Sequence, residues 1–97
     1  MRLSENAISE QLTMLPKWKL KDVKWIERSY RFQDFLQAIS FVNRVATYAE
    51  NINHHPFINI QYKMVIIRLN SWNEKGLTEL DFTMARQMDQ IYDTNYR

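Results

Sequence analysis

The sequence predicts an α+β fold, in which a four-stranded antiparallel sheet is covered on one face by three helices in the order αββαββα. Two pairs of short segments alternate apolar and polar residues across brief turns, as the strands of hairpins do. Three longer segments repeat apolar residues every three or four positions, which is typical of amphipathic helices. Because no repeat or linker interrupts this pattern, we expect residues 1–97 to form a single domain.

The first helix is expected over about residues 5–14, with Ser4 as its N-cap and Pro16 ending it. Residues 18–21 and 25–32 then alternate in hydrophobicity and contain aromatic and β-branched side chains. They predict the first hairpin, with a turn at Asp22.

The second helix is the longest, over about residues 35–52, and Asp34 is a suitable cap for it. A second hairpin is expected from residues 58–62 and 64–70. We expect the Tyr62 ring to lie in the core, because an aromatic residue at such a position packs in the core more often than it contacts a ligand.

The last helix begins after Thr78, an N-cap. Asp81 occupies the third helical position, where its carboxylate can accept from the Thr78 N–H in a capping box. Gly76, just before this cap, is expected to relieve a tight turn.

Composition excludes several classes of function. The net charge of +2 is spread along the chain, which disfavours direct nucleic-acid binding, and no apolar run is long enough to cross a membrane. The absence of Cys excludes disulfides, a thiol nucleophile and thiolate zinc sites, and is compatible with the cytoplasm. The single glycine excludes a P-loop or a dinucleotide fingerprint.

Both histidines of the chain, His54 and His55, are adjacent, and they lie between Glu50 and Pro56. A histidine with an unperturbed pKa of about 6.5 can donate and accept protons near neutral pH. On a helix, Glu50 and His54 would be neighbours, so that the carboxylate orients the imidazole. Pro56 favours an extended His55, and both rings are then able to border one cleft.

Other interpretations of this segment remain open. A helix ending in two histidines and a proline can simply complement the helix dipole. Two histidines and a glutamate can bind zinc, but the spacing differs from the usual one and no third His or any Cys is present. A Ser-His-Asp hydrolase lacks a glycine-flanked nucleophile here.

The residues Glu50, His54-His55-Pro56, Tyr62, Trp72 and Asp81 follow one another at a spacing that resembles the signature of the pterin-4a-carbinolamine dehydratase family. The resemblance covers nearly the whole chain, since residues 15–18, 30–32 and 41–46 are also similar to segments of that family.

The resemblance implies the dehydration of 4a-hydroxytetrahydropterin to quinonoid dihydropterin and water, without a metal or redox cofactor. This step belongs to tetrahydrobiopterin recycling, next to aromatic amino acid hydroxylases. It also implies a homodimer or homotetramer, which we expect in the cytoplasm.

The resemblance also suggests site residues. We expect His54, His55 and Glu50 to be catalytic, and Pro56, Trp72 and Asp81 to bind substrate. Many relatives have a third histidine where this chain has Trp72; an indole cannot exchange protons at neutral pH, but it can stack on a pterin.

Two non-catalytic hypotheses compete with the enzyme. Some relatives stabilise transcription factors as dimerisation partners, so the chain could be a homo-oligomeric interaction protein. An RNA-binding sheet is less favoured, because the four basic residues near its strands, Arg28, Arg31, Lys63 and Arg68, are scattered.

Overall fold

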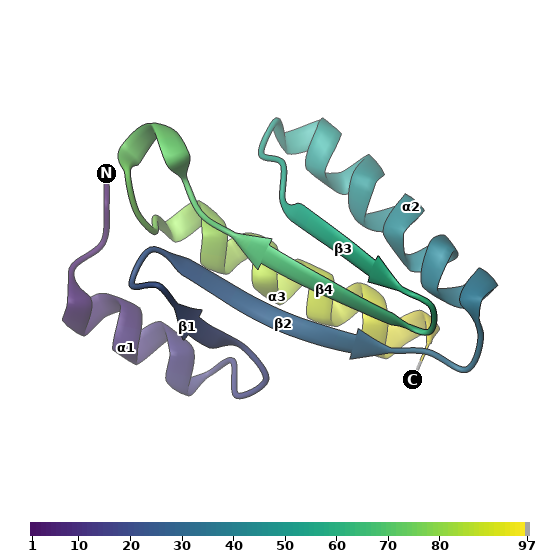
Figure 1. The fold of residues 1–97 in the computed structure, drawn as a ribbon. Coiled ribbons are helices and arrows are strands. Elements are labelled where there is room, and N and C mark those ends of the chain that lie inside the picture. Colours follow the sequence, from purple (N-terminus) through teal and green to yellow (C-terminus); the bar gives the residue numbers. More distant parts are fainter. Residues whose placement is uncertain (97) are drawn as a thin grey trace.

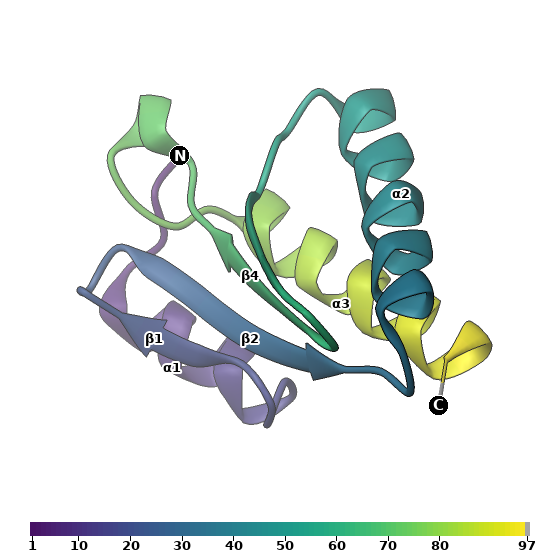
Figure 2. The same ribbon diagram turned by 45° about the vertical axis from the view of Figure 1, so that its right-hand side comes forward.

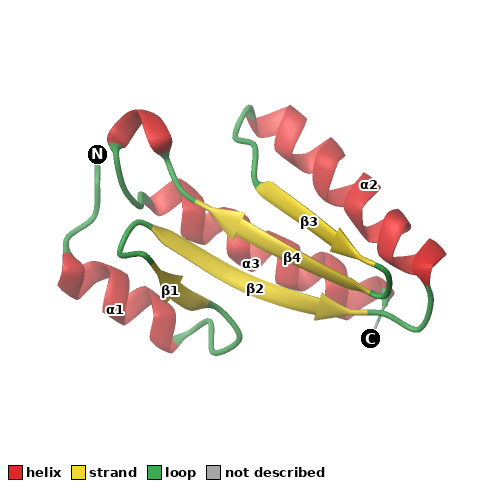
Figure 3. Cartoon of the chain, viewed as in Figure 1, coloured by secondary structure: helices red, strands yellow, loops and turns green. Residues whose placement is uncertain are grey.

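The computed structural model describes residues 1–96 and confirms the predicted class and element order. The elements are α1 (Glu5–Thr13), β1 (Lys19–Lys21), β2 (Trp25–Arg31), α2 (Phe35–Ile52), β3 (Phe57–Gln61), β4 (Met64–Leu69), the short 3-10 helix η1 (Trp72–Glu74) and α3 (Glu79–Asn95) (Figures 1 and 3). None of these helices is both long and apolar enough to span a lipid bilayer.

The predicted helix caps are present. The Ser4 hydroxyl accepts a hydrogen bond from the Ala7 N–H at 3.1 Å, and the Asp34 carboxylate accepts from the Gln37 N–H at 2.8 Å. These bonds satisfy donors that the first turn of a helix leaves without an internal partner.

The four strands are ordered β1-β2-β4-β3, and all neighbours are antiparallel. β4 therefore lies inside the sheet, and its alternation is regular: Val65, Ile67 and Leu69 are buried, whereas the residues between them are partly exposed. Period-two alternation of this kind is produced by a sheet with one covered face.

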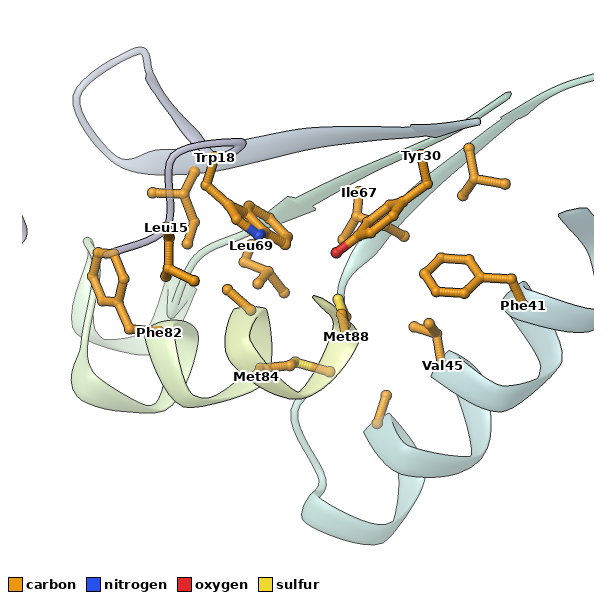
Figure 4. Packing of buried hydrophobic residues seen from close by; sticks show 14 of the residues in the cluster. Leu15, Trp18, Tyr30, Phe41, Val45, Ile67, Leu69, Phe82, Met84 and Met88 are labelled. Atoms are coloured by element: carbon orange, nitrogen blue, oxygen red, sulfur yellow. The ribbon is translucent and has the colours of Figure 1, made fainter. Parts of the chain in front are cut away.

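All three helices cover that face. Ile8 of α1, Phe41 of α2 and Phe82 of α3 belong to one buried cluster with the inward side chains of β2 and β4. Figure 2 shows α2 and α3 together on one side of the strands. Figure 4 shows the buried hydrophobic side chains that pack between these helices and the strands. The side chain of Gln11 in α1 also bonds Glu79 in α3 at 3.0 Å.

The expected core position of Tyr62 is wrong. Gln61 pairs with Met64, so Tyr62 and Lys63 form the turn between β3 and β4. Tyr62 has a positive φ of 55° there, and its side chain is 67% exposed. β3 therefore ends at Gln61, one residue before the end that the apolar pattern predicts.

The first hairpin has a comparable turn. Lys21 pairs with Trp25, and in the turn between them both Asp22 and Val23 have positive φ, at 53° and 67°. Val23 is 71% exposed.

Gly76 has a different role from the expected one. Its own φ is not positive; the neighbouring Lys75 has the left-handed conformation instead. A Cβ at residue 76 would lie 2.5 Å from Cδ of Arg2, so the glycine leaves room for the side chain of Arg2.

A partly buried polar cluster adjoins the core, where Asp89 of α3 accepts three hydrogen bonds. The donors are the Trp18 indole at 3.0 Å, the Arg28 guanidinium at 2.6 Å and the Tyr30 hydroxyl at 2.5 Å. The Arg28 guanidinium also lies over the Tyr30 ring, 4.1 Å from its centre. Burial, reinforced by the negative charge of Asp89, raises the pKa of Tyr30 well above its usual value of about 10.

Candidate active site

The end of α2 determines how the histidines are placed. The helix stops at Ile52, and Asn53 takes the left-handed conformation, with φ 53° and ψ 45°. A left-handed residue turns the chain away from the helix axis. His54 and His55 therefore lie beyond the helix, on the segment that leads through Pro56 into β3.

The expected pairing of Glu50 with His54 is wrong. Glu50 instead bonds the next histidine, with its carboxylate oxygen 2.7 Å from Nε2 of His55. The prediction assumed that α2 continues to His54, but Asn53 breaks the four-residue spacing on which it depended.

His54 is held by a carboxylate from the other end of the chain. Its Nε2 lies 2.6 Å from Oδ1 of Asp81, in the first turn of α3. The second oxygen of Asp81 accepts from the Thr78 N–H and from the Ser71 hydroxyl, both at 2.9 Å. The capping role that the sequence predicts for Asp81 is thus present together with a contact to His54.

The two imidazole–carboxylate pairs differ in their surroundings. Asp81 is fully buried and the His54 side chain is only 13% exposed, whereas His55 and Glu50 are 57% and 79% exposed. Water competes for the second pair, so Glu50 holds His55 more weakly than Asp81 holds His54.

Both histidines border one hollow of about 520 Å³. The segment before β3 contributes His54 and His55, and the connection from β4 to α3 contributes Trp72; these two segments lie at the same end of the molecule (Figures 1 and 2). The remaining lining residues are Met1, Asn53, Asn70, Ser71, Asn73, Glu74, Thr78 and Leu80.

Not every predicted site residue reaches this hollow. Trp72 lines it and is 81% exposed, so its indole is free to contact a ligand. Glu50, Pro56 and Asp81 do not line it. Tyr62 follows the far end of β3, away from the histidines.

The sequence interpretation missed Ser71. It is 3% exposed, and its hydroxyl bonds both Asp81 and Thr78. Its only signal in the sequence is its position beside Trp72, which gives no reason to assign it a role.

The chemistry available in this hollow is proton transfer, because two imidazoles, each bonded to a carboxylate at Nε2, border it. Within residues 1–96, no group of three or more His, Asp or Glu side chains is placed to hold a metal ion.

Comparison with known proteins connects this geometry to a family. The family model described as pterin 4 alpha carbinolamine dehydratase matches residues 1–91. The chain belongs to this family.

Curated relatives of this family are similar over nearly their whole length. A protein of Chloroflexus aggregans is 44% identical over 93% of this chain and 96% of its own, and one of Picosynechococcus is 40% identical over 93% and 97%. Their names provisionally assign both as pterin-4-alpha-carbinolamine dehydratases.

Two solved structures share the fold. A Brucella melitensis protein described as a transcriptional coactivator/pterin dehydratase has a TM-score of 0.89 and 39% identity, covering 94% of this chain and 98% of its own. A pterin dehydratase-like protein, described as a RuBisCO assembly factor in the alpha-carboxysome, has a TM-score of 0.67 and 21% identity, over 77% of this chain and 88% of its own. The latter shows a shared fold alone.

Proposed function

We propose that this protein converts 4a-hydroxytetrahydropterin to quinonoid dihydropterin and water. The observation that carries the proposal is the placement of two imidazoles, each held at Nε2 by a carboxylate, around one hollow that the indole of Trp72 also borders. The family of the chain supplies the substrate class.

The reaction requires two proton transfers and no change of oxidation state overall. One proton is delivered to the departing 4a-hydroxyl group, which leaves as water, and one is removed from N5 of the pterin as the C=N bond forms. Side chains that exchange protons near neutral pH suffice for both steps.

The hydrogen bonds indicate which ring atoms transfer these protons. An ionised carboxylate only accepts hydrogen bonds, so His54 and His55 must each present an Nε2–H to their partner. In the neutral imidazole, the lone pair is then on Nδ1. Within residues 1–96, neither Nδ1 atom has a hydrogen-bond partner, and we assign proton transfer to these two atoms.

The contrast in burial suggests a division of roles. The shielded His54, fixed by the buried Asp81, is suited to act as the base that removes the N5 proton. His55 is open to water and can be protonated again from solvent, which suits the acid that protonates the hydroxyl group.

The other predicted site residues contribute in different ways under this proposal. Trp72 offers its ring for stacking on the flat pterin. Glu50 and Asp81 act through the histidines they bond. Pro56 acts through the backbone, because it restricts His55 to an extended conformation.

The wider context belongs to the same proposal. An aromatic amino acid hydroxylase would supply the carbinolamine, and the product would return to the tetrahydropterin pool in the cytoplasm. A homodimer or homotetramer would cover exposed apolar side chains such as Leu36 of α2 and Phe57 of β3, which are 76% and 54% exposed.

The test is an assay of carbinolamine breakdown with the intact protein, His54→Ala and His55→Ala. Because positioned acid–base groups contribute about 10²–10⁴-fold to rate, we expect His54→Ala to lose at least about 100-fold in kcat and His55→Ala to lose less. Asn51→Ala, at an exposed position near the end of α2, is the control and should retain full activity.

The outcomes separate the hypotheses. Breakdown at the uncatalysed rate with the intact, folded protein would refute the enzyme and favour the non-catalytic interaction protein. A larger loss in His55→Ala than in His54→Ala would leave the enzyme in place but reverse the assigned importance of the two histidines.

A further inference from the structure

We propose that Ser71 is a positioning residue that fixes the tautomer and orientation of His54 through Asp81. The kinetic part of this inference rests on the proposed dehydratase function. The structural part does not, because it concerns hydrogen bonds within the protein.

The direction of each hydrogen bond follows from counting protons. The Asp81 carboxylate can only accept, so the single hydroxyl proton of Ser71 must point to its Oδ2, 2.9 Å away. The Ser71 oxygen is also 2.8 Å from the Thr78 hydroxyl. Since the Ser71 proton is already engaged, Thr78 must donate in that contact.

The result is a chain with one direction: the Thr78 hydroxyl donates to Ser71, and Ser71 donates to Asp81. The Thr78 N–H donates to the same Oδ2 at 2.9 Å. Two donors therefore occupy Oδ2, which leaves Oδ1 directed at Nε2 of His54. The carboxylate cannot rotate about its own axis without breaking bonds to buried donors.

Ser71 is itself rigidly placed. It is 3% exposed, its N–H donates to the Gly76 carbonyl at 3.0 Å, and its carbonyl accepts from the Glu74 N–H at 2.9 Å. These backbone bonds close the loop that carries Trp72. The same residue thus connects the loop bearing the indole with the carboxylate that holds the imidazole.

Loss of the Ser71 hydroxyl would remove one of the two donors to Oδ2 and would deprive the Thr78 hydroxyl of its acceptor. The carboxylate would gain freedom to turn, and His54 would no longer be held in a single tautomer. We expect kcat to fall about tenfold or more, because a hydrogen bond to a charged group is lost, while KM changes little.

The experiment compares Ser71→Ala with Ser71→Thr, which keeps a hydroxyl group, and with Ser40→Ala as a matched control. Ser40 lies in α2, where its hydroxyl is 2.6 Å from that of Tyr96, so this control also deletes one side-chain hydrogen bond, but outside the hollow. If Ser71→Ala does not fold, Ser71→Cys, of nearly the same shape and with a weaker donor, replaces it.

Two readouts are measured on each variant: kcat and KM for carbinolamine breakdown, and the ring ¹⁵N chemical shifts of both histidines at a pH where they are neutral. The chain has only two histidines, so the signals can be assigned with His55→Ala. We expect the intact protein, Ser71→Thr and Ser40→Ala to show His54 as the Nε2–H tautomer, and Ser71→Ala to show a mixture of tautomers.

An unchanged tautomer in Ser71→Ala would overturn the proposal, whether or not kcat falls, because the effect would then not pass through His54. A similar loss of kcat in Ser40→Ala would also overturn it. If the intact protein has no dehydratase activity, the proposed function fails, and the ¹⁵N shifts still decide the role of Ser71.

Discussion

Two aspartates of α3 illustrate how single residues organise this protein. Asp81 and Asp89 are eight positions apart on the same helix, and each accepts hydrogen bonds from several side chains or backbone groups. Asp81 is fully buried, with a hydrogen-bond partner for each oxygen, whereas Asp89 is partly buried and accepts all three of its bonds at Oδ1. Asp81 serves the hollow, whereas Asp89 joins α3 to β2 and to Trp18.

Removing the second of these carboxylates should be costly. Asp89→Ala would leave the Arg28 guanidinium and two further donors without their acceptor in a largely shielded place. We expect the free energy of unfolding in urea to fall by up to about 3–5 kcal/mol, the range for fully buried ion pairs that lose one partner, because this pair is only partly buried.

A control for Asp89→Ala is Asp22→Asn, which removes the charge of the exposed partner of Arg68 and tolerates the positive φ of this position. That variant should lose less than about 1 kcal/mol. Equal losses in the two variants would mean that the cluster around Asp89 contributes no more than a surface ion pair.

At the scale of elements, the decisive feature is the C-terminal end of α2. Asn53 in the left-handed conformation ends the helix, and its N–H bonds the Ala49 and Glu50 carbonyls. This one residue determines that Glu50 bonds His55 and leaves His54 to Asp81.

The conformation of Asn53 yields a prediction. Alanine is disfavoured in the left-handed region by about 1 kcal/mol, whereas glycine adopts it without steric cost. Asn53→Ala should therefore reduce the free energy of unfolding by about 1 kcal/mol and reduce carbinolamine turnover, while Asn53→Gly should stay within about 0.5 kcal/mol of the intact protein. Denaturant titration of both variants checks this, and an equally stable Asn53→Ala would contradict it.

The sequence predicted those parts of the fold that depend on local spacing. Period-two and helical repeats located every main helix and strand, and short-range caps such as Ser4 and Asp34 are recognisable from residue type alone. The residue at which α2 ends was harder to predict. An Asn just before the histidines is a recognised stop signal, and giving it more weight would have corrected the pairing of Glu50.

The long-range contacts could not be predicted, because nothing local encodes them. Arg28 alternates with Ile26 and Tyr30 along β2, but nothing in this pattern indicates its partner, Asp89, which lies 61 positions away. Asp81 was predicted both as a cap and as a site residue, but its bond to His54 depends on how α3 packs beside the end of α2.

At the scale of the whole molecule, the buried Tyr30 makes stability depend on pH. Its folded pKa is raised by burial and by Asp89, whereas in the unfolded chain the value is about 10. Below pH 10 both states carry the proton, so stability is unaffected by this group. Above it the unfolded state releases the proton first, and stability falls by about 1.4 kcal/mol for each pH unit.

We therefore expect the urea midpoint of the intact protein to decrease steadily above about pH 10. Tyr30→Phe, which keeps the ring but has no proton to lose, should show a shallower decrease over the same range, from a lower starting stability. Parallel curves for the two proteins would exclude Tyr30 as the cause.

The turn between β1 and β2 has a further consequence for the molecule. Val23 is a β-branched residue held at a φ of 67° on the surface, a combination that stores local strain. Substitution by Asn, which accepts this conformation more readily, should raise the melting temperature by a few degrees. The protein thus contains unused thermal tolerance at a residue that does not line the hollow, and this reserve could compensate for destabilising changes introduced when the hollow is engineered for other substrates.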